Sequence, residues 1–237
     1  MGNILEKIEQ ETSTTNERNL WGDLSPDIKP KKPEFEILES KIFRVTPQRP
    51  LQTHIEGFTE IRMVMYVQRV DFIVDLFDLY GIEKAEIIVG DSVVTKNRSS
   101  TEPEVFLRLA KLIEEGRLSV RVPKNNRTFH EKWILAEKDN EFSDIFGTAN
   151  LTSRGSGISG KQSNQVRVRN IQGEYKNSDE YLELCETYYW YHSNSEEYLD
   201  ELVDLLNKDD APDIEVVERW VSYTGSSSSA DVTKVHA

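Results

Sequence analysis

The sequence predicts an α/β protein, with a mixed β-sheet flanked by helices. Short apolar segments rich in Ile, Val and Met alternate with segments whose apolar residues recur at helical spacing, and a run of further strand-like segments follows. Such an order indicates a sheet with helices packed against it. The 237 residues are 37% hydrophobic and 30% charged, which is typical of a globular chain.

The first half of the chain carries the alternation. Residues 1–33 are polar and proline-rich toward their end, so we expect a polar N-terminal arm. One or two short strands are expected within 35–45, and buried strands at 61–67, 84–91 and 118–122. Helices are expected at 69–81 and 103–116, because each segment has helical periodicity and ends at a glycine.

The second half begins with consecutive strands, which we expect at 129–137, 144–151 and 164–170. Two helices are expected next, at 178–194 with Ser178 as the N-cap, and at 195–209. The segment 223–237 is rich in Ser and reads as a disordered tail or a linker to a further region. The predicted organisation is therefore an arm at 1–33, one domain at 34–222 and this tail.

Composition limits the classes of function. No segment approaches the roughly 18 consecutive apolar residues of a membrane span, so no membrane partner is expected. Cys185 is the single cysteine, which fits a reducing, cytoplasmic compartment, and one Cys with four scattered His lacks the spacing of a zinc site. The net charge of −13 argues mildly against a broad nucleic-acid surface, but a basic cluster lies between Lys124 and Arg169.

The stretch "TFHEKWILAE" holds the first chemical signal. His130 and Lys132 lie two residues apart in a predicted strand, so their side chains share a face. Two potentially cationic groups side by side repel each other unless an anion lies between them. In "GTANLTSRG", Thr148 and Asn150 are again two apart and add a hydroxyl and a carboxamide donor. Together the four side chains form a seat for a phosphate group.

The combination His130-x-Lys132 and Gly147-Thr148-x-Asn150 resembles the signature of the phospholipase D superfamily, over roughly residues 55–195. The family pattern is H-x-K, four residues, Asp, six residues, then G-S/T-x-N. The resemblance implies a phospholipase D-like fold and no cofactor or metal.

The chain departs from that pattern at two positions. The family Asp falls on Glu137, with Asp139 and Asp144 as nearby alternatives, and the gap to Gly147 is three residues longer than usual. The Glu that steadies the family His falls on Gln165, which accepts a hydrogen bond but supplies no negative charge, and Asn164 beside it is a second candidate for orienting the His. Further expected substrate-binding groups are Gly147, Arg154, Lys161 and Arg167.

The resemblance implies phosphodiester cleavage in which one His forms a phosphohistidine and a second His protonates the leaving oxygen. The chain has one motif, because no Lys lies two residues after His54, His192 or His236. A homodimer that places two copies of the motif face to face would supply the second imidazole.

The expected function is therefore a metal-independent endonuclease acting on nucleic acid, with DNA favoured, in restriction or defence, and joined to or associated with a helicase or a recognition module. Two alternatives stay open. A phospholipase or phosphatidyl transferase would require a second motif, or an apolar entrance with a membrane anchor. A non-catalytic nucleic-acid-binding and dimerisation module is favoured by Gln165 and by the acidic composition.

Overall fold

The computed structural model describes residues 32–66, 69–90, 101–125, 127–152, 155–158, 163–210 and 212–230, with side chains of the last segment described as far as Tyr223. From Pro33 onward the described residues form one unit. Its eight strands are β1 (Phe35–Val45), β2 (Glu60–Met65), β3 (Lys84–Val89), β4 (Leu118–Pro123), β5 (Lys132–Lys138), β6 (Glu141–Gly147), β7 (Asn164–Gly173) and β8 (Ser195–Glu197).

Five α-helices and two short 3-10 helices are described around the strands. The α-helices are α2 (Val70–Asp78), α4 (Pro103–Glu114), α5 (Asp179–Ser193), α6 (Asp200–Lys208) and α7 (Asp213–Ala230), and the 3-10 helices are η1 (Leu51–His54) and η3 (Tyr175–Asn177). No described helix combines the length and the apolar character that crossing a bilayer requires.

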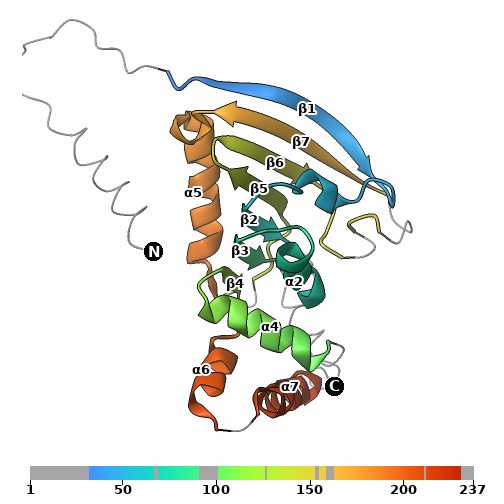
Figure 1. The fold of residues 1–237 in the computed structure, drawn as a ribbon, viewed down its shortest axis with the longest axis vertical. Coiled ribbons are helices and arrows are strands. Elements are labelled where there is room, and N and C mark those ends of the chain that lie inside the picture. Colours follow the sequence, from blue (N-terminus) through green and yellow to red (C-terminus); the bar gives the residue numbers. More distant parts are fainter. Residues whose placement is uncertain are drawn as a thin grey trace, which may run out of the picture. The chain divides into compact units, whose positions relative to one another are not determined.

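The strands form one sheet in the order β1-β7-β6-β5-β2-β3-β4-β8 (Figure 1). β2, β3 and β4 are parallel to one another, while the other neighbouring pairs are antiparallel. The prediction of an α/β protein with a mixed sheet flanked by helices is confirmed.

Each face of the sheet has its own apolar core. On one face, Met63, Ile87 and Ile134 pack with buried residues of α2, α4, α6 and α7. On the other face, Trp133 and Leu135 pack with the aromatic side of α5 and with η3. Figure 1 shows α5 on one side of the sheet and α2 on the other. Successive residues of β5 alternate between the two cores, so the sequence of this strand reads as continuously apolar.

The predicted helix 178–194 is confirmed as α5, and Ser178 caps it. The Ser178 hydroxyl accepts a hydrogen bond from the backbone N–H of Tyr181 at 3.2 Å, which satisfies one of the free donors of the first turn.

The prediction of a single helix over 195–209 is wrong in its first part. Residues Ser195–Glu197 form β8, which pairs antiparallel with β4 at the border of the sheet. Tyr198 N–H donates to Val120 O at 2.7 Å, and Leu199 adopts a left-handed φ of 73°, which a continuous helix excludes. Residues 195–197 therefore pair with the open edge of β4 in spite of their helical periodicity, and the helix begins at Asp200.

The C-terminal segment also differs from its expectation. α7 runs from Asp213 to Ala230 and so includes residues 223–230, which the Ser-rich composition predicts as tail. Val216, Val217 and Trp220 are buried and anchor the start of this helix, and Ser is only moderately unfavourable within a helix that is already nucleated. Residues 231–237 of the predicted tail, and residues 1–31 of the predicted arm, lie outside the described residues.

Candidate active site

Five strand ends meet at one edge of the sheet. β2, β3 and β6 run in one direction and end there at Met65, Val89 and Gly147, while the antiparallel β5 and β7 begin there at Lys132 and Asn164. The carboxyl ends of parallel strands are the usual place for ligands in such sheets. The four residues of the predicted phosphate seat, His130, Lys132, Thr148 and Asn150, lie at or beside these strand ends.

His130 and Lys132 are brought together immediately before β5. The Lys132 ammonium donates to the His130 carbonyl at 2.9 Å, and its Nζ lies 3.3 Å from His130 Nδ1. The prediction that both residues belong to one strand is wrong for His130, because β5 begins at Lys132. The backbone of this segment pairs instead with the strand ends beside it, as Tyr66 N–H donates to Glu131 O at 2.8 Å and Phe129 N–H donates to Gly90 O at 2.7 Å.

Tyr66 completes the surroundings of this pair. Its ring centroid lies 4.3 Å from that of His130, and Lys132 Nζ lies 4.9 Å from the same ring centroid. Burial is the main cause that lowers the pKa of Lys132, so its ammonium is less strongly protonated than that of a surface lysine. The sequence reasoning missed Tyr66, although it lies near the end of the predicted strand 61–67 and has a side chain with a polar tip.

Gly90 is a second residue that the sequence reasoning missed, because it was assigned only to the end of a strand. A Cβ atom at this position would lie 1.8 Å from Phe129 O and 2.7 Å from Tyr66 Cα. Both are backbone atoms, so only glycine lets the segment that carries His130 cross the ends of β2 and β3 this closely.

Gly147 and Thr148 join the end of β6 to the start of β7. A Cβ at Gly147 would lie 2.2 Å from Gln165 O. Thr148 N–H donates to the same carbonyl at 3.0 Å, and Gln165 N–H donates to the Thr148 hydroxyl at 3.1 Å. β6 ends at Gly147, so the prediction of a strand that includes Thr148 and Asn150 is wrong. One backbone bond and one bond to the Thr148 side chain thus hold the two segments together at the point where the strand stops.

Asn150 lies in the turn after β6, next to the start of α2. Ala149 and Leu151 are buried while Thr148 is exposed and Asn150 half-buried, so Thr148 and Asn150 still present one side of the chain. Arg69 N–H, at the N-cap of α2, donates to Leu151 O at 3.2 Å. A Cβ at Gly155 would lie 2.4 Å from Asn150 O, and this close approach fixes the turn.

Asn164 and Gln165 lie on opposite faces of β7. Asn164 is buried, and it shares the face of Val166 and Val168, which belong to the same core as Ile134 and Ala136 of β5. Lys132 precedes Ile134 and Ala136 at intervals of two residues on β5, so its side chain points to the same face. Asn164 Oδ1 accepts from the Thr148 hydroxyl at 3.3 Å, and its amide donates to Gly155 O at 2.8 Å.

The structure places Gln165 away from the face that carries Lys132. It is exposed, and strand alternation turns it toward the α5 face, away from Lys132. Asn164, which the sequence offered as a second candidate, occupies the face of the site. Neighbouring positions on a strand point to opposite faces, so Asn164 and not Gln165 shares the face of Lys132, and the role of Gln165 stays a prediction.

The three candidates for the family Asp lie away from His130. Glu137 is five residues along β5 from Lys132, roughly 16 Å, and is paired with Lys176 at 3.3 Å. Asp139 is in the turn after β5 with φ 53°. Asp144 is buried on the α5 face, where it accepts from Trp133 Nε1 at 2.9 Å and from Arg169 Nε at 3.0 Å.

The predicted substrate-binding cations are only partly described. Arg167 is half-exposed on the α5 face, with Nη2 3.6 Å from Asp144 Oδ2, so it is not brought to the side chain of Lys132. Arg154 and Lys161 lie outside the described residues.

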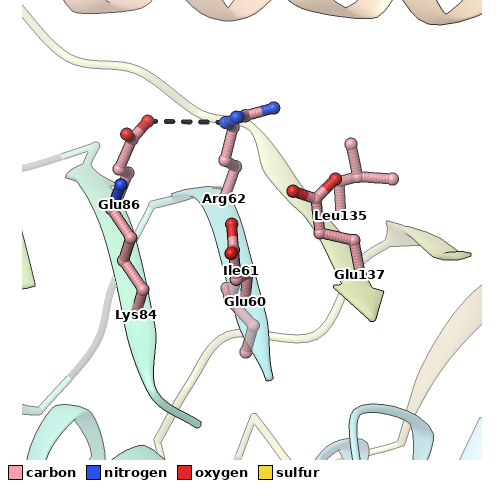
Figure 2. Close-up of a pocket in the computed structure, with 7 residues that line it drawn as sticks. All are labelled: Glu60, Ile61, Arg62, Lys84, Glu86, Leu135 and Glu137. Atoms are coloured by element: carbon pink, nitrogen blue, oxygen red, sulfur yellow. Dashed lines mark ion pairs between the residues drawn. The ribbon is translucent and has the colours of Figure 1, made fainter. Parts of the chain in front are cut away.

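A separate pocket lies at the opposite edge of the sheet, near the starts of β2 and β3 (Figure 2). Arg62 Nε is 3.5 Å from Glu86 Oε2, and Arg62 Nη1 donates to the Tyr181 hydroxyl at 2.9 Å. The same pocket includes Glu137. Arg62 thus links the pocket to Glu86 and to α5, and Glu137 is paired with Lys176 from outside the lining.

No protein-family model matches the chain, and no curated protein matches it. Solved structures do match at low identity. A yeast tyrosyl-DNA phosphodiesterase has 11% identity and a TM-score of 0.38, with 55% of this chain and 32% of that chain covered. A phosphatidylserine synthase from Haemophilus influenzae has 14% identity and a TM-score of 0.46, with 84% of this chain and 47% of that chain covered. A polyphosphate kinase from Porphyromonas gingivalis has 14% identity and a TM-score of 0.32, with 55% and 23% covered.

The chain thus spans less than half the length of these solved proteins. With TM-scores below 0.5, these overlaps carry no argument about the function of the chain. The chain resembles the phospholipase D superfamily in its H-x-K and G-T-x-N residues and in the mixed sheet that carries both segments to one edge.

Proposed function

We propose that the chain is a metal-independent phosphodiesterase that hydrolyses DNA as an endonuclease. The observation that carries the proposal is the contact of the His130 imidazole with the Lys132 ammonium at the sheet edge where Thr148 and Asn150 also emerge. An imidazole is a nucleophile, and the ammonium, hydroxyl and carboxamide are donors for phosphate oxygens.

The reaction would proceed in two displacements. A ring nitrogen of His130 attacks phosphorus, the bond from phosphorus to the leaving oxygen breaks, and a second imidazole gives its proton to that oxygen. Water then attacks the phosphohistidine while the second imidazole takes up a proton, which restores His130. Lys132 and Asn150 donate to the equatorial oxygens as charge develops on them.

The second imidazole would come from a twin subunit. Of the other histidines in the described residues, His54 is packed against Phe43 with a ring-centroid distance of 4.9 Å, and His192 lies on α5 against Tyr188. Neither has a lysine two residues on. A symmetric homodimer that places the two His130 side chains across a two-fold axis supplies both histidines from one motif.

DNA is favoured over lipid by the local charge. Lys124 and Arg127 lie on the segment that leads to His130, although the chain as a whole carries a net charge of −13. A cytoplasmic location, a role in restriction or defence, and a helicase or recognition module as partner belong to the same proposal.

Plasmid cleavage in EDTA tests the proposal. The wild-type chain should cut, and His130→Ala should abolish cutting, because it removes the nucleophile. Lys138→Ala, an exposed lysine at the other end of β5, is the matched control and should cut like the wild type. A denaturing gel of end-labelled DNA should also show a covalent adduct in the wild type and none in His130→Ala.

Three results would redirect the proposal. Cleavage that depends on added metal would contradict the mechanism. Activity on phospholipid micelles alone would favour the phospholipase or phosphatidyl transferase alternative. DNA binding by a wild-type chain that forms no adduct and cuts nothing would favour the non-catalytic module.

A further inference from the structure

Trp190, in the last turn of α5, is a large aromatic side chain that stays 54% exposed. Its ring centroid is 5.9 Å from that of Phe129 and 5.1 Å from that of Tyr191. Phe129 is buried and directly precedes His130 in the chain. The exposed indole of Trp190 therefore packs against two other rings, next to the segment that carries the proposed nucleophile.

Lys124 and Arg127, the cationic residues of that segment, are hydrogen-bonded to the same end of α5. Lys124 N–H donates to Asn194 O at 3.0 Å, and Lys124 Nζ donates to Ser193 O at 3.3 Å. The Arg127 guanidinium donates to the Asn194 side-chain oxygen. The Asn194 amide in turn donates to Trp190 O at 2.8 Å. The indole, the guanidinium and the ammonium thus belong to one connected piece of structure, which continues through Phe129 into His130.

These groups match the requirements of single-stranded nucleic acid. Aromatic side chains stack on unpaired bases, and neighbouring cations hold the phosphates between them. Phe146 on β6 and Tyr223 on α7 are also exposed aromatic residues, but the contact with Phe129 places Trp190 next to the segment that carries His130. The nearby acids are Glu186, one turn earlier on α5, and Glu131, which takes part in a hydrogen bond with Tyr191.

We propose that Trp190, Arg127 and Lys124 form a stacking platform for an unpaired base of the strand whose phosphate lies at His130. The inference rests on the proposed function and narrows its substrate to nucleic acid with unpaired bases near the scissile bond. The base stacks on the open part of the indole, while Arg127 and Lys124 bind neighbouring phosphates.

Binding to two probes tests the platform. In the His130→Ala background, fluorescence anisotropy would compare an oligothymidine with an abasic strand of the same length. Trp190→Ala should raise the Kd for oligothymidine about tenfold and leave the Kd for the abasic strand unchanged, because only the former has bases to stack. Arg127→Ala should weaken both and reduce the slope of log K against log salt by about 0.7, as expected for one phosphate contact.

Tyr223→Ala is the matched control, since Tyr223 is an exposed aromatic residue at 79% on α7. It should preserve the preference for oligothymidine. The platform would be refuted if Trp190→Ala weakened both probes equally, weakened neither, or dissociated a dimer in light scattering, which would make Trp190 a subunit contact. Tight binding of a duplex that depends on Trp190 would refute it as well.

The failure of the platform and the failure of the proposed function give different results. Hydrolysis of plasmid and of bis(4-nitrophenyl) phosphate by the wild-type chain in EDTA reports on the reaction alone. Hydrolysis without a preference for oligothymidine refutes the platform, whereas a Trp190-dependent preference without hydrolysis refutes the reaction.

Discussion

At the scale of single residues, Lys132 is the most informative side chain of the site. Its ammonium is half-buried against Tyr66, and it donates to the His130 carbonyl while lying beside the imidazole. This position costs the ammonium part of its hydration, which a bound phosphate would compensate with its own oxygens. An anion bound at Lys132 therefore stays the prediction that the spacing of His130 and Lys132 makes.

We expect cleavage to fall at alkaline pH earlier than an ordinary lysine would allow. Burial lowers the pKa of Lys132, and the charged form is the one that binds phosphate, so the active fraction is lost as pH rises through the lowered pKa. The pH profile of kcat/KM checks this. Lys132→Arg should move the alkaline limb to higher pH, and a limb unchanged in that variant would show that another group titrates.

Asn164 and Gln165 form a second test at this scale. Asn164→Ala removes the acceptor of the Thr148 hydroxyl and the side-chain donor to the Gly155 carbonyl, so we expect a loss of about 1–3 kcal/mol in the free energy of unfolding, together with slower cleavage. Gln165→Ala, one residue away but exposed on the other face, should change neither. Urea denaturation and initial rates measure both. The reverse ranking would restore the orienting role to Gln165.

At the scale of elements, the position of the site depends on two close approaches of the backbone. Gly90 lets the segment 129–131 pass over the ends of β2 and β3, and Gly147 lets β6 close against the start of β7. Gly147 stands out in the sequence as part of the motif, whereas Gly90 only marks the end of an apolar run, so its close approach is not visible there.

We expect Gly90→Ala to reduce both stability and cleavage, because the new methyl group would meet Phe129 O at 1.8 Å and must displace the segment that carries His130. Gly116→Ala is the control. Gly116 has a φ of 68° with nothing within 4 Å of an added Cβ, so the change should cost about 1 kcal/mol of stability and leave the cleavage rate intact. Thermal unfolding measures the loss of stability in each variant, and kcat/KM measures the loss of activity. Equal loss of activity in both variants would mean that general destabilisation is the cause.

The elements also show how far the sequence leads. Periodicity finds β2, β3, β4, α2, α4 and α5, because each is long enough to express its repeat, and the motif residues predict which segments meet. It fails at His130, Thr148 and Asn150, which lie just outside their strands. The backbones of Phe129, Glu131 and Thr148 bond to neighbouring strand ends, and Asn150 O accepts from Thr152 N–H in a turn. It also fails at Ser195–Glu197, where the edge of β4 supplies partners that a local pattern does not reveal.

At the scale of the whole molecule, the question is how many chains make one site. If two His130 side chains act on one phosphate, both subunits must be intact. Mixing the wild type with excess His130→Ala after subunit exchange should then lower cleavage with the square of the wild-type fraction. Light scattering would give the oligomeric state of each mixture, and a linear fall would show that each protomer works alone.

The pairing of β1 with β7 has a consequence for folding during synthesis. Phe35 is opposite Gly173, so the first strand of the sheet finds its neighbour only after most of the chain has left the ribosome. Until then, Phe43 and Val45, which pack into the core of the folded protein, are exposed on a nascent strand that lacks its partner. We infer that newly made chains depend on chaperone protection during synthesis more than a protein of this size with sequentially paired strands would.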